Sequence, residues 1–297
     1  MMSTSFHSGF VAIIGRPNVG KSTLLNRLVG EKVSIVSNKP QTTRSRVMGV
    51  MNRNDLQIVF VDTPGIHQAR TKLGEYMDAS IQEAVKGIDA LLFVIDASHV
   101  TEQDRRLAME SARRKGTKLF VLNKIDLVPP GALLPLIEEF QSLGYDAYLP
   151  VSANTGDGVE ELIRELSRRM PEGPKFFPDD MLTDQPERVL CAEIIREKAL
   201  LHLRDEVPHG VGIEVIKYER RERSTEIDVT MYCEKASHKS IIIGKNGATL
   251  KLIGQEARLE MEALFGYHIN LQIWVKVRPN WRNSLEDLKT LGYQLNQ

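Results

Sequence analysis

The chain has 297 residues, of which 42% are hydrophobic and 26% charged, and its 39 basic and 39 acidic side chains cancel. This is the composition of a globular protein long enough for two domains with separate cores, without the overall basic field that attracts nucleic acid. No apolar run reaches the roughly 18–20 residues needed to cross a bilayer, and no basic region of a signal peptide precedes the first apolar stretch.

From Phe10 to about Met170, short apolar runs alternate with amphipathic stretches. Apolar residues at helical spacing run from Leu73 to Val85 and from Val159 to Met170. Strands that alternate with helices predict an α/β domain with a mostly parallel sheet, which we expect to span residues 1–172. Its strands, buried on both faces, are expected at Phe10–Ile14, Ile58–Val61, Leu91–Ile95, Leu119–Leu122 and Tyr148–Val151.

Residues 173–187 interrupt this rhythm, because prolines punctuate them and Phe176 and Phe177 could hold them to one domain. They predict a linker to an α+β domain at residues 188–297. Cys191 and Cys233 lack metal-ligand spacing, which predicts buried thiols in a reducing cytosol. The second domain is expected to hold a helix over about Glu187–Leu203, strands Gly212–Arg220 and Thr225–Cys233, two helices around Gly244–Gly247, an alternating strand Ile269–Val277 and a short helix over about Ser284–Leu291.

A phosphate-binding loop is predicted directly after the first strand. Glycines let the backbone wrap a phosphate, and the N–H groups with the dipole of the following helix attract the anion. Lys21 would reach the β- and γ-phosphates, and the Ser22 hydroxyl would ligate Mg²⁺. The residues expected to bind nucleotide here are Gly15, Arg16, Pro17, Asn18, Val19, Gly20, Lys21, Ser22 and Thr23.

Three further segments follow later strands and complete a guanine nucleotide site. Asp62 would hold Mg²⁺ through water, and the Gly65 N–H would meet the γ-phosphate. Asp126 can accept two N–H groups of guanine, which adenine does not offer in that arrangement, so GTP is preferred over ATP. The residues of these segments are Asp62, Thr63, Pro64, Gly65 and Ile66, then Asn123, Lys124, Ile125 and Asp126, then Ser152 and Ala153.

The four segments in this order resemble the translation-factor-like class of GTPases. The resemblance implies that residues 40–44, Pro-Gln-Thr-Thr-Arg, are a first switch whose threonine closes on Mg²⁺ when the γ-phosphate is present. Thr43 is the preferred ligand and Thr42 the alternative, so Ser22, Thr43 and Asp62 form the expected metal set. Lys21, Thr43 and Gly65 are expected to act on the reacting phosphate.

Hydrolysis is expected to be slow. Many GTPases place a water-orienting glutamine directly after the Asp-x-x-Gly segment, whereas this chain has Ile66, which neither donates nor accepts. Asn18 could compensate by holding K⁺ beside the phosphates together with backbone oxygens of the first switch. The alternative is that Asn18 only caps a turn.

A second motif, Ile241-Ile-Ile-Gly-Lys-Asn-Gly247, has the pattern of a KH domain, in which a G-x-x-G loop between two helices grips a nucleic-acid backbone. Basic residues around it form a local patch. Trp281 could stack on a base or pack in the core. The expected RNA contacts are Lys239, Ile243, Gly244, Lys245, Asn246, Gly247, Lys251, Arg258, Lys276, Arg278, Trp281 and Arg282.

The whole pattern resembles the Era GTPases. The shared features are the QTTR switch, the DTPG-Ile-His run ending at His67, the FFPDD linker and the C-terminal type II KH domain. The resemblance implies a bacterial, cytoplasmic monomer that binds GTP or GDP and the 3′ end of small-subunit ribosomal RNA, and that assists maturation of the small ribosomal subunit. It also implies loose association with the inner face of the membrane.

Two other functions remain open at this stage. A GTP-driven RNA-modifying or tRNA-acting enzyme would need a second catalytic site, and the sequence offers no cysteine nucleophile, metal cluster or methyl-donor motif for one. A membrane-tethered cell-cycle switch would use its C-terminal domain to contact a protein.

Overall fold

The structure is a computed structural model that describes residues 5–39, 41–66 and 69–293. Two compact units make up the described chain: residues 5–39, 41–66 and 77–184 form one, and residues 69–76 and 185–293 form the other. Pro40 of the predicted first switch and His67 of the DTPG-Ile-His run lie outside the described residues.

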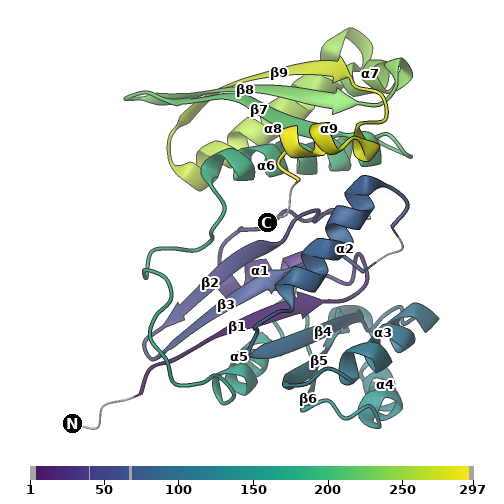
Figure 1. Ribbon diagram of the computed structural model, residues 1–297, viewed down its shortest axis with the longest axis vertical. Helices are drawn as coiled ribbons and strands as arrows, with labels where there is room; N and C mark the ends of the chain where they lie inside the picture. The colour runs from purple at the N-terminus through teal and green to yellow at the C-terminus, as the bar shows by residue number, and fades with distance from the viewer. Residues whose placement is uncertain (1–4, 40, 67–68, 294–297) are drawn as a thin grey trace. The chain divides into compact units, whose positions relative to one another are not determined.

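The first unit is built on a six-stranded sheet with the order β2-β3-β1-β4-β5-β6 (Figure 1). Its strands are parallel except β2, which pairs antiparallel with β3, so the predicted mostly parallel α/β fold is confirmed. The strands are β1 (His7–Ile14), β2 (Val47–Arg53), β3 (Leu56–Asp62), β4 (Ala90–Asp96), β5 (Thr117–Asn123) and β6 (Ala147–Pro150). The helices are α1 (Lys21–Val29), α3 (Glu102–Ala112), α4 (Leu133–Gln141) and α5 (Val159–Ser167), together with the part of α2 (Lys72–Ala84) from Met77 onward.

Alternate residues of the central strands enter two separate cores. Val11 and Ile13 of β1 pack with residues of α1 and α5, whereas Ala12 and Ile14 pack on the other face with residues of α3 and α4. Since successive side chains of a strand point to opposite faces, a strand that is apolar throughout must be covered on both sides. The loops that carry the predicted nucleotide-binding segments therefore lie at the ends of the strands, outside the two cores.

The strand β2 was missed by sequence reasoning. It contains Gly49 and follows the first switch without a clear apolar alternation. In the structure Gly49 lies under α1, where an added Cβ would come within 2.7 Å of Val29 Cγ2 and 2.8 Å of Leu25 Cδ1. The glycine therefore permits the close packing of α1 on this edge strand.

The segment after α5 is held on the first unit. The buried amide of Gln57 accepts from the Phe176 N–H (2.7 Å) and the Phe177 N–H (3.0 Å), and it donates to the Phe177 carbonyl (2.8 Å). Further along, the Val50 N–H donates to the Leu182 carbonyl at 2.9 Å. The expected linker is thus attached to the sheet edge as far as Asp184, whose Oδ1 accepts from the Met48 N–H at 3.3 Å.

The second unit is an α+β fold with a three-stranded sheet of order β7-β8-β9. β8 pairs antiparallel with β7 and parallel with β9, and α6 and α8 cover one face over a common apolar core. The expected helix–strand–strand–helix–helix–strand order is present. Its elements are α6 (Glu187–His202), β7 (Gly212–Arg220), β8 (Ser224–Cys233), α7 (Ala236–Ile243), α8 (Ala248–Phe265), β9 (His268–Val277) and α9 (Leu285–Thr290).

Candidate functional site

The loop between β1 and α1 has the geometry of a phosphate cradle. Gly20 has φ +96°, and an added Cβ would lie 2.2 Å from Asn123 Nδ2. That amide donates to the Val19 carbonyl at 2.8 Å, so the loop after β5 is tied to the phosphate loop as the sequence predicts. Only glycine fits where the two loops meet.

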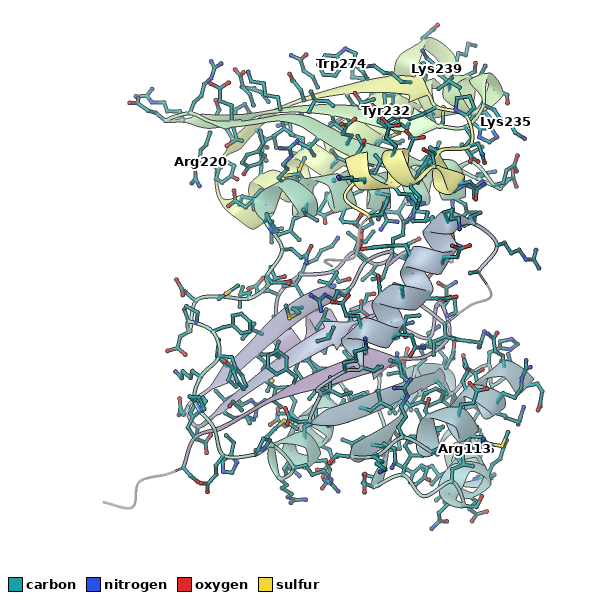
Figure 2. All side chains as sticks on the ribbon, viewed as in Figure 1. Arg113, Arg220, Tyr232, Lys235, Lys239 and Trp274 are labelled. Carbon is teal, nitrogen blue, oxygen red and sulfur yellow. The ribbon has the colours of Figure 1, made fainter. Side chains whose placement is uncertain are left out.

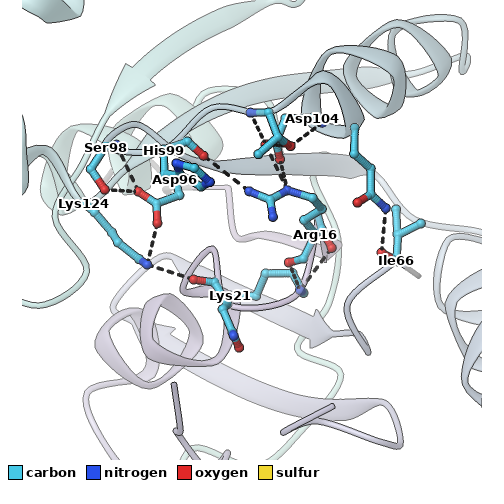
Figure 3. A network of polar contacts seen from close by, with 12 residues as sticks. Arg16, Lys21, Ile66, Asp96, Ser98, His99, Asp104 and Lys124 are labelled. Atoms are coloured by element: carbon cyan, nitrogen blue, oxygen red, sulfur yellow. Dashed lines mark hydrogen bonds and ion pairs between the residues drawn. The ribbon is translucent and has the colours of Figure 1, made fainter. Parts of the chain in front are cut away.

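Lys21 lies buried at the start of α1 (Figure 3). Its Nζ donates to the Gly15 carbonyl (3.1 Å) and the Arg16 carbonyl (2.9 Å). Burial lowers the pKa of Lys21 to about 8, although nearby Asp62 opposes this shift. An anion bound beside the ammonium would stabilise its charged form and raise the pKa again.

Three oxygen-bearing side chains converge beside Lys21. Ser22 Oγ lies 2.6 Å from Asp62 Oδ2 and 2.8 Å from Thr43 Oγ1. Thr42 instead donates to the Lys39 carbonyl at 2.6 Å, so Thr43 and not Thr42 faces this cluster. Burial raises the pKa of Asp62, which Lys21 and hydrogen bonds oppose, and among the described residues its Oδ1 has no hydrogen-bond partner.

The segment after β3 closes against the phosphate loop. A Cβ on Gly65 would come within 2.6 Å of Pro17 Cα, and the Ile66 N–H donates to the Gly15 carbonyl at 3.1 Å. The Ile66 side chain is partly buried against the α3 side of the core. It offers no polar atom with which to orient water.

The residues predicted to recognise the base are held by a second set of contacts. Ser152 Oγ donates to Asp126 Oδ1 at 2.6 Å, and Lys124 Nζ lies 2.6 Å from Asp96 Oδ2 and 2.8 Å from the Asn18 carbonyl. The Ala153 N–H donates to Asn123 Oδ1 at 3.0 Å. Asp126 itself is exposed, with its second oxygen available to a ligand.

In the second unit, the G-x-x-G loop joins α7 to α8 through unusual backbone angles. Gly244 has φ +73°, Asn246 +53° and Gly247 +78°, and a Cβ on Gly244 would lie 2.2 Å from Thr249 Oγ1. Lys245 and Asn246 are exposed at its tip. Such a turn exposes backbone to an approaching phosphate.

A groove of about 670 Å³ continues from this loop along α8 and β9. Sequence reasoning assigned Lys251, Arg258 and Gly247 to RNA, whereas it placed Leu271 and Ile273 only on the apolar face of the alternating last strand and gave them no role. They are half-buried because α8 covers the edge strand only in part, which the apolar alternation alone did not reveal. The lining residues are Gly247, Leu250, Lys251, Gly254, Gln255, Arg258, Leu271 and Ile273.

One predicted RNA contact needs correction. Trp281 is fully buried, and its Nε1 donates to the Gly210 carbonyl at 2.9 Å, so the core alternative is right and base stacking is excluded in this conformation. The exposed tryptophan is Trp274 of β9, 45% exposed and labelled in Figure 2. By strand alternation it shares the open sheet face with Lys276, away from the groove.

The other basic side chains are partly engaged with acids. Arg278 Nε lies 2.7 Å from Asp287 Oδ1, and Arg282 pairs with Glu234 at 2.5 Å. Neither arginine is among the residues that line the groove. Lys239 and Ile243 lie on α7, directly before the G-x-x-G loop.

Two protein families match the chain, one largely within the first unit and the other within the second. Residues 10–124 match the 50S ribosome-binding GTPase family, and residues 206–282 match the KH domain family. Two curated relatives cover nearly the whole chain. The GTPase Era of Ruminiclostridium cellulolyticum is 50% identical over 99% of both chains, and that of Clostridioides difficile is 49% identical over 97% of this chain and 99% of its own.

The chain belongs to the Era GTPase family. GTP hydrolysis is accordingly its enzymatic activity. Two solved structures of Era match with a TM-score of 0.93 and 40% identity over 98% of this chain and 100% of theirs. One is a complex with MgGDPNP and nucleotides 1506–1542 of 16S ribosomal RNA, and the other is a tyrosine-to-alanine variant of Aquifex aeolicus Era bound to GDP·AlF4⁻. None of the helices in the described part of this Era-family chain has the length and apolar character needed to span a bilayer.

The pKa of Lys21 predicts how nucleotide affinity depends on pH. If Lys21 holds the phosphates as the sequence predicts, their negative charge would raise that pKa on binding. Nucleotide affinity would then be full while the free protein keeps the proton on Lys21, and it would fall as pH rises above about 8. We expect GDP to bind about tenfold more weakly at pH 9 than at pH 7. Fluorescent GDP titrations measure this, and Lys21→Arg, which stays charged, is the control. An equal pH dependence in both proteins would assign it to another group.

Proposed function

We propose that this GTPase binds the 3′ end of small-subunit ribosomal RNA in the groove beside the G-x-x-G loop and assists maturation of the small ribosomal subunit. One observation carries the proposal. The G-x-x-G loop, whose residues have positive φ angles, leads directly into a groove that is lined by both apolar and basic side chains of the same domain. A relative crystallised with nucleotides 1506–1542 of 16S ribosomal RNA supports this choice of ligand.

The chemistry of the groove suits single-stranded RNA. Unstacked bases can pack on Leu271 and Ile273, while phosphates approach the Gly244–Gly247 backbone. Lys251 and Arg258 add charge along the same groove, although Arg258 shares its charge with Glu262 at 2.9 Å. A double helix would not expose its bases to such a groove, so we expect a preference for a single-stranded end.

We further propose that the bound nucleotide governs RNA affinity. Full-length protein loaded with a non-hydrolysable GTP analogue is expected to bind a single-stranded RNA of the 16S 3′ end about tenfold more tightly than protein loaded with GDP. Fluorescence anisotropy at one fixed salt concentration measures both affinities. Equal affinities would remove the coupling while leaving RNA binding itself in place.

For the nucleotide site, we propose the roles that the four sequence segments predict. Ser22, Thr43 and Asp62 would hold Mg²⁺, because hard oxygen donors suit that ion and the free Oδ1 of buried Asp62 gives it a further acceptor. When bound, Mg²⁺ neutralises charge on the β- and γ-phosphates. Lys21 would hold the same phosphates, the Gly65 N–H would meet the γ-phosphate, and Asp126 would select guanine.

We also propose that K⁺ supports hydrolysis at Asn18. Asn18 Nδ2 donates to the Asn38 carbonyl at 2.8 Å, so the amide and a backbone oxygen just before the first switch already lie together. Rotation of the Asn18 amide would turn its oxygen toward the cation, so that all ligands of the K⁺ would be oxygen atoms. A cation there would supply charge that Ile66 cannot.

Exchange of K⁺ for Na⁺ tests this site. Steady-state GTP hydrolysis by the wild-type protein is expected to be about tenfold faster in K⁺ than in Na⁺ at equal ionic strength, and Asn18→Ala should abolish the difference. The rates are compared at saturating GTP, so that a change in nucleotide affinity caused by Asn18→Ala does not alter the ratio of the K⁺ and Na⁺ rates. Equal wild-type rates in the two salts would eliminate the K⁺ site.

Two expectations from the resemblance stay proposals. Association with the inner membrane surface would appear as co-sedimentation with lipid vesicles, and a monomeric state as a single species near 33.5 kDa in light scattering. The roles proposed for the groove and for the nucleotide site depend on neither.

A further inference from the structure

We propose that Asp104, at the start of α3, is a positioning residue that fixes the phosphate loop through its contact with the Arg16 side chain. This inference rests on the proposed nucleotide site and concerns a residue that none of its four sequence segments contains. Figure 3 shows the two side chains facing one another between the phosphate loop and α3.

The contact is built as a fixed anchor. Both carboxylate oxygens of Asp104 lie 2.9 Å from Arg16 Nε, and Arg16 Nη2 donates to the His99 carbonyl at 3.4 Å. The Asp104 side chain has no exposed surface and that of Arg16 is 19% exposed. A charge-assisted hydrogen bond in such surroundings is stronger and better oriented than an exposed ion pair.

Asp104 is itself held in place by the first turn of its helix. Its Oδ2 accepts from the Thr101 N–H (2.9 Å) and from Thr101 Oγ1 (2.7 Å), while the Thr101 hydroxyl accepts from the Asp104 N–H at 3.3 Å. This capping box would be complete without Arg16. The additional bond to Arg16 therefore serves the loop, since the helix does not require it.

The residues that Asp104 holds are the ones that position Lys21 and the segment after Asp62. The Gly15 carbonyl accepts from both Lys21 Nζ and the Ile66 N–H, and the Arg16 carbonyl accepts from Lys21 Nζ. A shift of the Gly15–Arg16 peptide would therefore move the Lys21 ammonium and the segment after Asp62 together. Asp104 limits that shift.

The test measures GDP dissociation from the full-length protein with a fluorescent GDP. Asp104→Asn and Arg16→Gln are each expected to speed dissociation about tenfold, as loss of a buried charge-assisted bond implies. The double variant should dissociate at about the same rate as either single variant, because the two side chains act through one contact. Additive effects in the double variant would overturn the proposal.

Two controls separate positioning from stability and charge. Leu107→Ala removes a buried apolar side chain of the same helix without removing a partner of Asp104, and Glu102→Gln removes one negative charge from the same turn on an exposed side chain. Both should dissociate GDP within twofold of wild type, even where the melting temperature falls as far as in Asp104→Asn. Equal acceleration by Leu107→Ala at equal melting temperature would make the role structural and refute positioning.

Two further outcomes are distinguishable. Should Asp104→Asn fail to fold, Arg16→Gln on its partly exposed side chain decides alone, and a wild-type rate in that variant would refute the proposal. Failure of the wild-type protein to bind GDP would instead refute the proposed nucleotide site on which it rests.

Discussion

Asp126→Asn is expected to change the nucleotide preference from guanine to xanthine. Ser152 Oγ donates to Asp126 Oδ1, so that oxygen is engaged and the other terminal atom faces the ligand. In the variant the atom that faces the ligand would be the amide nitrogen of asparagine, which is a hydrogen-bond donor. It would repel the N–H groups of guanine, but it could donate to the 2-carbonyl of xanthine. Loss of two bonds to a charged acceptor, at about 1.5 kcal/mol each, lowers GTP affinity roughly 100-fold.

Displacement of a bound fluorescent nucleotide by GTP and by XTP measures the affinity of the protein for each. Asp157→Asn makes the same charge change in the neighbouring loop, where Asp157 Oδ2 accepts from Thr155 Oγ1, and should leave both affinities unchanged. Weak binding of both nucleotides by Asp126→Asn would mean a damaged loop. Unchanged GTP affinity would mean that another residue selects the base.

The double substitution Lys245→Asp, Asn246→Asp is expected to abolish RNA binding while the fold persists. It places two negative charges at the tip of the G-x-x-G loop, where RNA phosphates would approach. Asn246 has φ +53°, a conformation that aspartate tolerates almost as well as asparagine, so the loop geometry should survive. We expect roughly a 100-fold loss of affinity for the single-stranded 16S 3′ end, with a shallower salt dependence.

The matched control for this loop is Lys289→Asp, a charge reversal at an exposed lysine of α9. It should keep RNA affinity within about twofold. GTP hydrolysis measured without RNA and the melting temperature should be unchanged in both variants. Retention of RNA affinity by the loop variant would place the RNA elsewhere on the protein.

Sequence patterns predicted the parts of this protein that depend on local chemistry. Strands buried on both faces stand out as apolar runs, and the phosphate and guanine segments carry glycines and polar residues at fixed spacing. β2 was missed because its Gly49 is explained only by Leu25 and Val29 of α1 packing on it. Such packing is a tertiary property that no window of sequence reveals.

The side-chain environment of the RNA groove was predicted less well. Leu271 and Ile273 alternate like core residues, and their partial exposure follows from β9 being an edge strand. Trp281 carries the residue type of a stacking platform, yet its ring N–H is satisfied inside the domain by Gly210. The pairing of Arg16 with Asp104 joins positions 88 residues apart and has no sequence signature.

The fully buried amide of Gln57 decides where the chain can be cut to express the first unit alone. Its oxygen and nitrogen are both satisfied by backbone of Phe176 and Phe177. A fragment that stops at residue 172 would take both of its partners from the Gln57 oxygen, whereas the nitrogen would keep its bond to Asn52 Oδ1 at 2.7 Å. The lost partners of a buried acceptor cost about 1–3 kcal/mol. An expression fragment of the GTP-hydrolysing half should therefore end after Asp184, beyond the last strand-like pairing at Thr183.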